Sequence, residues 1–261
     1  MHLLPNSLYL HVVWNVSPEI YGYRWYSMLM GLAVMYGGFL SLWFFKRENK
    51  PQSEDVPITG VTIAAAIIGA RLAHVFFYDW PYYSKHPEHI PIIWMGGLAS
   101  HGALVGVIIA IYLYCHIRGR LHYWWVYDRI ALAAPLIAAM IRVGNLFNSE
   151  LYGKPADLPW AFIFTRVDML PRHPVQLYEA AGYLLIGIYM MWAYLKRPAT
   201  WQYGRYTAMF LTLANTVRFF MEYFKDMPVV WGPFTMGQWL SLPFIALGLL
   251  IWWLSLRGKL K

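Results

Sequence analysis

Seven long apolar runs, separated by short polar segments, dominate the hydropathy pattern of this 261-residue chain. A helix that crosses a bilayer needs about 20 mostly apolar residues, and each run is close to that length. Their approximate bounds are 23–45, 56–77, 94–116, 124–147, 176–195, 204–222 and 235–256. Helices of a soluble bundle would carry a charged outer face, whereas these runs are apolar on most sides. The pattern predicts an all-α integral membrane protein with seven transmembrane helices.

The basic residues between the runs predict how the chain is oriented. One set of connections, which includes Lys46, Arg118, Lys196 and Arg257, carries eleven Lys and Arg residues, against six in the other set. Cytoplasmic loops carry the excess of positive charge. With seven spans, this bias places the N-terminus outside and the C-terminus in the cytoplasm.

Two segments are expected to lie on the outer surface. Residues 1–22 are interpreted as an arm along that surface, with a frayed tail as the alternative. Residues 148–175 contain four prolines, and the aromatic and β-branched stretch Trp160–Val167 predicts a strand. We therefore expect a small extracytoplasmic cap containing short strands. Because no internal repeat or long linker interrupts the chain, residues 1–261 are expected to form a single membrane-embedded domain.

Composition supports the membrane interpretation and argues against other classes. Hydrophobic residues make up 59% of the chain and charged residues 13%, whereas soluble domains carry about 25% charged residues. The 14 Trp and 20 Tyr suit the bilayer interface. A single cysteine, Cys115, excludes an internal disulfide, and it lies too near the inner end of its run to act as a nucleophile at an outer site. The net charge of +8 forms no basic stripe, so no nucleic-acid partner is expected.

Ionisable and polar residues within the runs gather near their outer ends. They are Tyr26, Arg71, His101, Arg142, Glu179, Arg218 and Glu222. Such residues are costly inside a membrane and therefore point to function. Transporters favour sites at the midplane, whereas a layer in the outer half favours chemistry on a lipid of the outer leaflet. Three arginines suit an anionic ligand such as a phospholipid phosphate.

Several of these residues also have a structural interpretation. Arg71 could extend to the outer head groups, and His101 could make only a hydrogen bond between helices. Arg218 and Glu222 are four positions apart and could form an intrahelical ion pair. At the inner ends, Asp128-Arg129 is interpreted as a snorkelling or paired structural group.

Residues 142–153 combine a cation, two amides, an acid and two glycines at a predicted helix end, which by itself could be a structural cap. The segment, Arg-Val-Gly-Asn-Leu-Phe-Asn-Ser-Glu-Leu-Tyr-Gly, resembles the signature of bacterial prolipoprotein diacylglyceryl transferases. Further segments resemble that family in the same order along the chain. They are 24–26, 69–71 with 77–78, 96–102, 173–179, 218–222 and 236–241.

The resemblance implies transfer of the diacylglyceryl group from phosphatidylglycerol to the lipobox cysteine thiol of a prolipoprotein. This step forms a thioether, releases glycerol phosphate and begins bacterial lipoprotein maturation. The implied partners are phosphatidylglycerol, prolipoprotein signal segments and membrane lipid, without a cofactor. The implied location is the bacterial cytoplasmic (inner) membrane, with a multi-pass chain whose active site faces the outer leaflet. The alternatives are a transporter or flippase for an anionic phospholipid, and an intramembrane peptidase, which would need a serine or paired acids at site depth.

The resemblance also implies catalytic roles for His101, Arg142, Arg218 and Tyr26. Arg142 and Arg218 would stabilise the charge that develops on the departing phosphate. His101 is the candidate base for the thiol, and it could instead only position a substrate. Tyr26 would orient the phosphate and the arginines by hydrogen bonds.

The remaining site residues are expected to bind or support the lipid. Phosphatidylglycerol binding is expected from Arg71, Arg142, Asn145, Glu150, Gly153, Arg218 and Glu222, and support from His173, Gln176, Tyr178 and Glu179. Gly153 would allow a close backbone approach, and Glu222 would orient Arg218. No role is carried to Lys225, because family members often have an arginine in that stretch. The outer-side histidines show no convincing ligand pairing, so no metal site is expected.

Overall fold

The computed structural model describes residues 11–93, 97, 99–197 and 201–260. The chain forms two compact units, which are described separately. The first unit comprises residues 1–37 and 130–261, and the second comprises residues 38–129. Helices α1 (Trp25–Arg47) and α5 (Tyr123–Asn148) each contribute residues to both units.

The long helices follow the predicted apolar runs. Besides α1 and α5 they are α2 (Asp55–Phe77), α4 (Ser100–Arg118), α6 (Val175–Leu195), α7 (Arg205–Met221) and α8 (Met236–Leu256). The predicted start of the third run, at residue 94, lies outside the described residues. Within the described part of the chain, four helices are long and apolar enough to cross a membrane: α1, α5, α8, and α2 together with the turn before it. The protein is therefore a mostly helical, multi-pass membrane protein.

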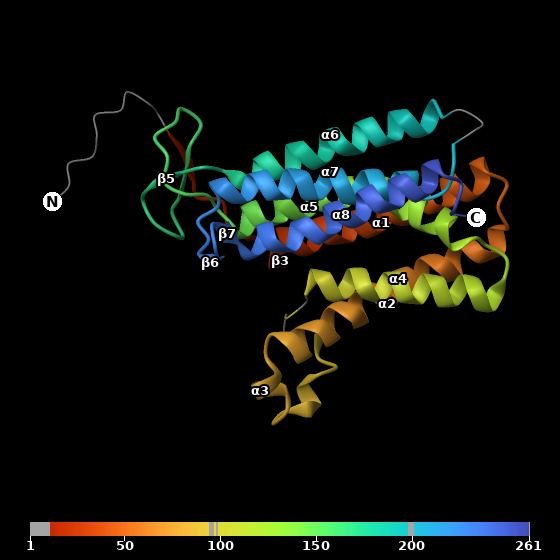
Figure 1. The fold of residues 1–261 in the computed structure, drawn as a ribbon. Helices are drawn as coiled ribbons and strands as arrows, with labels where there is room; N and C mark the ends of the chain where they lie inside the picture. The colour runs from red at the N-terminus through yellow and green to blue at the C-terminus, as the bar shows by residue number, and fades with distance from the viewer. Residues whose placement is uncertain (1–10, 94–96, 98, 198–200, 261) are drawn as a thin grey trace. The chain divides into compact units, whose positions relative to one another are not determined.

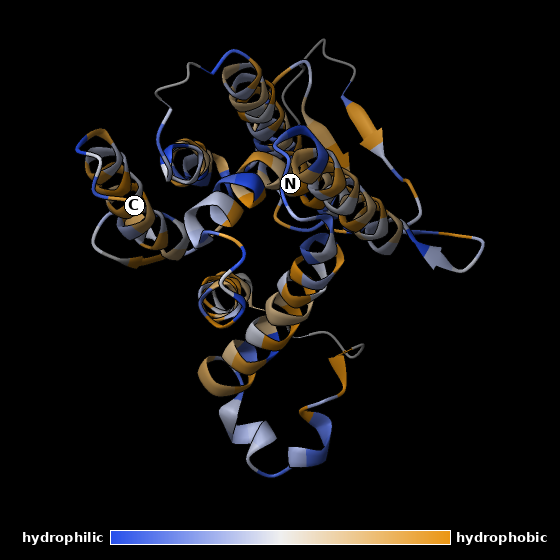
Figure 2. Ribbon diagram, turned by 90° about the vertical axis from the view of Figure 1, so that its right-hand side faces the viewer, coloured by the Kyte–Doolittle hydropathy of each residue, from blue (hydrophilic) through white to orange (hydrophobic). Residues whose placement is uncertain are grey.

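In the first unit, α7 lies between its neighbours α6 and α8 (Figure 1). Small residues allow this close packing. A methyl group on Gly248 of α8 would lie 2.4 Å from the Thr212 hydroxyl of α7, and one on Gly182 of α6 would lie 2.8 Å from Val217. Close backbone approach at small residues is how helices associate in membranes. The helix surfaces are coloured mainly apolar, and the strongest hydrophilic colouring lies mostly in loops and near helix ends (Figure 2).

A three-stranded sheet forms the cap of the first unit. Its strands are β1 (Val12–Trp14), β4 (Phe162–Phe164) and β5 (Pro171–Arg172), in the order β1-β4-β5. β1 runs parallel to β4, and β4 runs antiparallel to β5. The strand predicted within residues 160–167 is confirmed as β4. The predicted surface arm contributes β1 to this sheet, while residues 1–10 of the arm lie outside the described residues.

Two short hairpins lead directly into helices of the first unit. β2 (Glu19–Ile20) and β3 (Tyr23–Arg24) precede α1, and β6 (Val229–Trp231) and β7 (Phe234–Thr235) precede α8. The first hairpin turns at Tyr21 and Gly22, both at positive φ, and the Tyr21 side chain is 95% exposed. Thr235 caps α8 together with Gln238. The Thr235 hydroxyl accepts a hydrogen bond from the Gln238 N–H, and the Gln238 side-chain oxygen accepts one from the Thr235 N–H.

The second unit is built on the pair α2 and α4. A methyl group on Gly69 would lie 2.3 Å from the Gly102 carbonyl oxygen, and one on Gly106 would lie 2.5 Å from the Ala65 carbonyl oxygen. Backbone therefore meets backbone along this helix pair, which explains why the chain has glycine at these positions. After α2 come the short helix α3 (Trp80–Tyr83) and the 3₁₀ turn η2 (Pro87–His89); η1 (Gln52–Glu54) precedes α2.

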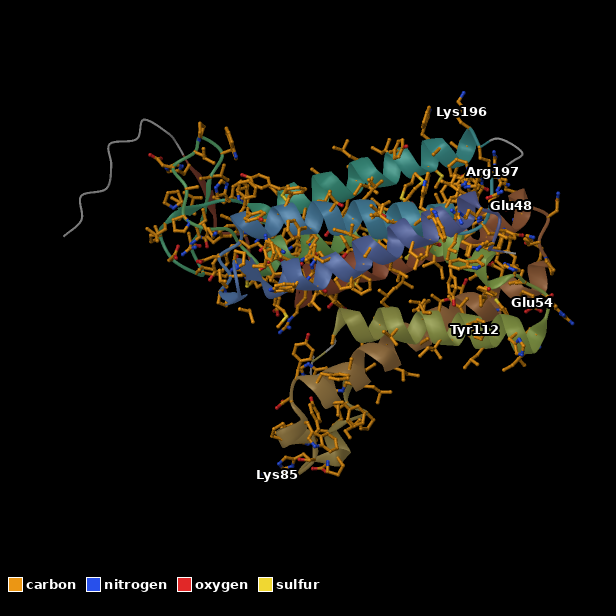
Figure 3. All side chains as sticks on the ribbon, viewed as in Figure 1. Glu48, Glu54, Lys85, Tyr112, Lys196 and Arg197 are labelled. Carbon is orange, nitrogen blue, oxygen red and sulfur yellow. The ribbon has the colours of Figure 1, made fainter. Side chains whose placement is uncertain are left out.

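Buried acids organise one end of the second unit. Glu48 and Glu54 lie at the end where α1 leads into α2 (Figure 3). Glu54 is fully buried and accepts hydrogen bonds from Arg118 and Arg120 at 3.1 and 2.9 Å. Arg129 donates to Glu48, at 2.6 Å to Oε1. The predicted paired group at Asp128-Arg129 is thus confirmed for Arg129, and its described acidic partner is Glu48.

Arg172 joins the cap to the segment after α7. Its guanidinium bonds the Asp168 carboxylate, the Asp226 carboxylate at 2.8 Å and the Gly153 carbonyl oxygen at 3.1 Å, and it stacks over the Tyr152 ring. The hydrogen bonds from Arg172 lower the pKa of Asp168. The ionised carboxylate therefore contributes to the stability of the cap.

This pairing predicts a pH-dependent cap. Since the folded pKa of Asp168 lies below its ordinary value of 3.8, the contribution is present above about pH 3.8 and is lost as the pH falls through the lowered pKa. Amide hydrogen exchange of residues 162–172 should be faster in Asp168→Asn than in wild type at pH 6. The difference should shrink when the two proteins are compared at the lowest pH at which both stay folded. An equal difference at both pH values would contradict this role.

Candidate functional site

The site in the first unit begins at the end of α5. Arg142 lies six residues before the end of that helix, and its Nε atom is 3.0 Å from Oε2 of Glu179 on α6. Nη1 of Arg142 is 3.5 Å from the Asn145 side-chain oxygen, a long contact. Glu179 is fully buried. The structure therefore anchors the Nε side of the guanidinium on a carboxylate.

Lys225 completes this buried ionic cluster. It follows the 3₁₀ turn η4 (Glu222–Phe224), and its ammonium nitrogen is 3.0 Å from Oε1 of Glu179 and 2.8 Å from Oε1 of Glu222. Its side chain is 3% exposed. Both oxygens of Glu179 therefore face cations, although neither contact is aligned as a hydrogen bond.

Glu222 lies against the first turn of α8. Its Oε2 atom accepts a hydrogen bond of 2.9 Å from the Thr235 hydroxyl. A methyl group on Gly237 would lie 2.4 Å from the Glu222 carboxyl carbon. Glu222 therefore lies at the N-terminus of α8, where a helix favours a nearby negative charge.

Arg218 lies in the last turn of α7, four residues before Glu222. The hydroxyl of Tyr183 on α6 lies within electrostatic range of Glu179, Arg142 and Arg218. Arg142 and Arg218 thus both act on the Tyr183 hydroxyl, and their joint role at a lipid phosphate stays a prediction. No described hydrogen-bond partner meets the buried Nε atom of Arg218 or the buried side-chain oxygen of Gln176. Buried polar atoms without partners are unusual and favour a ligand or water at that place.

Tyr26 lies against Gly144, the first glycine of the signature segment. A methyl group on Gly144 would be 2.7 Å from the Tyr26 ring, so glycine is what lets the ring lie against α5. The Tyr26 hydroxyl lies within electrostatic range of Glu150 and Arg142. Gln176 donates a hydrogen bond of 2.6 Å to the backbone carbonyl of Glu150.

Gly153 lies where three backbone segments meet. Its N–H donates to the His173 carbonyl, and it forms a bridge with Lys225. A methyl group there would be 2.6 Å from the His173 carbonyl oxygen and 2.8 Å from that of Phe224. The predicted close backbone approach at Gly153 is thus made to the protein's own backbone.

His173 belongs to a short hydrogen-bonded chain beside Gly153. The Trp160 indole N–H donates to the Tyr178 hydroxyl at 2.8 Å, and that hydroxyl is 3.3 Å from Nδ1 of His173. Since indole nitrogen can only donate, the Tyr178 proton is available to Nδ1. Burial lowers the pKa of His173, which favours the neutral imidazole.

Two predicted site residues belong to the second unit. His101 is in the first turn of α4, and its side chain lies outside the described part of the structure. Arg71 is buried and donates to the carbonyl groups of His89, Ile90, Ile92 and Gly97 at 2.7 to 3.3 Å. Arg71 therefore holds the loop after α3 together, and its part in lipid binding stays a prediction.

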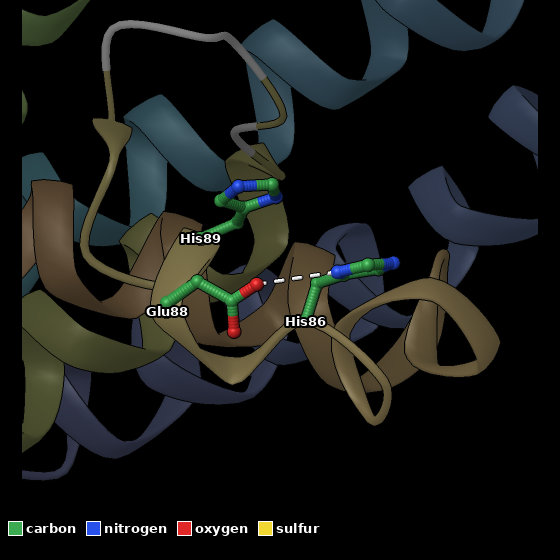
Figure 4. Close-up of side chains that lie close together, drawn as sticks. All are labelled: His86, Glu88 and His89. Atoms are coloured by element: carbon green, nitrogen blue, oxygen red, sulfur yellow. Dashed lines mark hydrogen bonds and ion pairs between the residues drawn. The ribbon is translucent and has the colours of Figure 1, made fainter.

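His86, Glu88 and His89 gather in this loop, a pairing that the sequence argument did not find. Their possible ligand atoms lie within 4.8 Å of one another (Figure 4). His86 is hydrogen-bonded to Glu88 at 3.2 Å, and His89 to Tyr82 at 2.6 Å. The two imidazole rings are stacked with planes 16° apart. The described hydrogen-bond partners of these two rings are thus Glu88 and Tyr82.

Lys225, Thr235 and Tyr183 are the site residues that sequence reasoning missed. One signal was available for Lys225. Arg218, Glu222 and Lys225 are spaced i, i+4 and i+7, which places them on one helical face. Thr235 and Tyr183 carried no comparable signal.

The helices and the ionic cluster of Arg142, Glu179, Lys225 and Glu222, with Arg218 one turn before Glu222, define a multi-pass membrane protein with a charged internal site. A family model described as prolipoprotein diacylglyceryl transferase matches residues 12–254. The chain belongs to this family.

Several phosphatidylglycerol–prolipoprotein diacylglyceryl transferases are similar over nearly the whole chain. The protein of Chloroherpeton thalassium is 42% identical, and the match covers 95% of both chains. The protein of Bacteroides fragilis is 36% identical over 98% of this chain and 99% of its own. The protein of Tolumonas auensis is also 36% identical, over 95% of this chain and 99% of its own.

The packing at Gly153 predicts a strong effect of a single methyl group. Gly153→Ala should sharply lower the yield of folded protein or its activity, because the contacting atoms are backbone and cannot move aside. Gly31→Ala is the matched control, since nothing lies within 4 Å of that position. Both variants are compared by the yield of folded protein after size-exclusion chromatography and by the rate of diacylglyceryl transfer. Equal behaviour of the two variants would contradict the packing argument.

Proposed function

We propose that this chain transfers the diacylglyceryl group of phosphatidylglycerol to the cysteine thiol of a prolipoprotein lipobox. The carbon–sulfur bond forms as the carbon–oxygen bond to phosphate breaks, and glycerol phosphate leaves with the electron pair. Membership of the family supports the reaction. The observation that carries the assignment of the site is the buried cluster around Arg142, Glu179 and Lys225.

The charge of the cluster suits a phosphodiester. Arg142, Arg218 and Lys225 contribute three positive charges, and Glu179 and Glu222 contribute two negative ones. The formal sum of +1 complements the single negative charge of the lipid phosphate. As the carbon–oxygen bond breaks, the phosphate gains charge, and fixed guanidinium groups stabilise that state more than the ground state.

The guanidinium nitrogens of Arg142 and Arg218 also support a role in binding the phosphate. Arg142 contacts Glu179 through Nε, and its outer nitrogens, which lie near Asn145 and Tyr183, would bind a phosphate in the planar geometry of guanidinium. The buried Nε of Arg218, without a described partner, would gain one from the phosphate. Asn145, Glu150 and Gly153 would shape this pocket, with Tyr26 above it and His173, Gln176 and Tyr178 in support.

The thiol must lose its proton before it attacks, because the thiolate is the nucleophile. His101 is the proposed base by residue type and by its place in the first turn of α4. His173 offers a second imidazole, kept neutral by its lowered pKa and located beside Gly153. The family's chemistry needs one base, and kinetics can decide between the two.

We propose that the chain spans the bacterial inner membrane seven times, with its N-terminus outside and its C-terminus in the cytoplasm. The seven long helices of the described residues and the excess of Lys and Arg in one set of connections support this topology. The active site would then face the outer leaflet, where the cap formed by β1, β4 and β5 would also lie.

Purified protein, phosphatidylglycerol and a lipobox peptide test the reaction. A thioether-linked peptide supports the transferase. Lipid movement between leaflets without a thioether product, in a folded sample, would instead support a flippase or transporter of anionic phospholipid.

Arg142→Ala should lower the transfer rate by at least about 100-fold, because a fixed charge at the developing phosphate is lost. The variant should still insert into the membrane, and its melting temperature is measured beside its activity because the Arg142–Glu179 ion pair is also lost. Arg142→Lys should restore little, since an ammonium lacks the planar fork. Arg257→Ala, an exposed arginine at the other end of α8, is the control and should be unchanged. Near-normal turnover of Arg142→Ala would refute the phosphate assignment.

His101→Gln and His173→Gln should separate the two candidate bases. Loss of the base should reduce kcat by about 100- to 10,000-fold and remove the acidic limb of the pH–rate profile. Loss of a positioning group should reduce kcat only modestly and should leave the shape of the pH–rate profile unchanged. If the acidic limb of the pH–rate profile persists in His101→Gln, His101 is a positioning residue and not the base.

A further inference from the structure

Lys225 is a lysine with almost no exposed surface, in the segment between η4 and β6. Lysine is rarely buried unless its charge is paired. Its backbone is held by the bridge to Gly153, and its neighbour Phe224 accepts a hydrogen bond of 2.8 Å from the Lys154 N–H. The ammonium group is therefore placed by the same backbone junction that closes the signature segment.

The partners of Lys225 are the two acids of the cluster. Its nitrogen is 3.0 Å from Glu179 and 2.8 Å from Glu222, so the contacted oxygens lie no more than 5.8 Å apart. The other oxygen of Glu179 contacts Arg142, and the other oxygen of Glu222 accepts from Thr235. Lys225 is thus the single described cation that contacts both acids.

We propose that Lys225 is a positioning residue for the transfer reaction, which compensates Glu179 and Glu222 so that Arg142 and Arg218 remain available to the lipid phosphate. This inference rests on the proposed function of the cluster. It assigns to Lys225 a role that does not require contact with either substrate.

The reason is the charge left behind when Lys225 is absent. Two buried carboxylates would then face each other without an intervening cation, and like charges at this distance repel. The remaining cations nearby, Arg142 and Arg218, would be drawn to them. The formal charge of the cluster would fall from +1 to zero, and both guanidinium groups would bind protein carboxylates instead of phosphate.

Four variants test this role. Lys225→Met removes the charge and keeps most of the side-chain length, while Lys225→Arg keeps the charge. Lys225→Met/Glu222→Gln removes one charge of each sign and restores the balance. Lys85→Met is the matched control, because Lys85 is exposed on the loop after α3 (Figure 3). Initial rates of thioether formation are measured against phosphatidylglycerol concentration, with thermal melting of each purified protein.

Lys225→Met should lower kcat/KM for phosphatidylglycerol by about 100-fold, with a raised KM, because phosphate binding and transition-state stabilisation both weaken. Lys225→Arg should stay within about threefold of wild type, and the double variant should recover about tenfold over Lys225→Met. A lysine that served packing alone would make the double variant no better than the single one. Lys85→Met should be unchanged.

Lys225→Met within about threefold of wild type, beside an inactive Arg142→Ala, would overturn this role and leave the phosphate assignment intact. Normal activity in both variants would refute the phosphate assignment itself. Should Lys225→Met not fold, charge compensation requires the double variant to recover folded, active protein. A double variant that also fails to fold, or folds without recovering activity, overturns the proposal.

Discussion

A charge that is removed from water must be compensated by its neighbours, and this constraint organises the first unit. Arg142 on α5, Glu179 on α6 and Lys225 after η4 form one chain of contacts, which Glu222 extends to the start of α8. Breaking one buried ion pair leaves the other charge uncompensated, at a cost of about 3–5 kcal/mol. Since these charges come from α5, α6 and the segment that follows α7, the relative placement of these segments is coupled to the electrostatics of the site.

The glycines around the cluster serve the protein's own packing. Gly144 makes room for the Tyr26 ring, Gly237 for the Glu222 carboxylate, and Gly153 for two backbone carbonyls. A side chain at any of these positions would displace the group that the glycine accommodates. The glycines of the signature region are therefore explained by contacts within the chain, without reference to a bound lipid.

Apolar run length predicted the helices well, because a bilayer-spanning helix depends on local composition. The concentration of aromatic and β-branched residues within Trp160–Val167 predicted β4. Contacts between distant segments were harder to predict. The sequence suggested that Arg218 and Glu222 pair along one helix, whereas the described ion pair of Glu222 is with Lys225. Arg129 likewise pairs with Glu48, 81 positions away. Which acid meets which cation depends on helix packing, and hydropathy does not carry that information.

The parallel pairing of β1 with β4 has a consequence for the biogenesis of the protein. Val12 pairs with Phe162, which the ribosome makes 150 residues later. During synthesis, β1 therefore has no β4 to pair with until the long helices α1, α2, α4 and α5 have been made. The three-stranded sheet of the cap can form only after β4 and β5 have been synthesised. The Trp14 indole donates a hydrogen bond to the Leu146 carbonyl near the end of α5, and Trp14 itself belongs to β1. Pairing of β1 with β4 thus follows synthesis of the helices α1 and α5, which carry Tyr26 and Arg142.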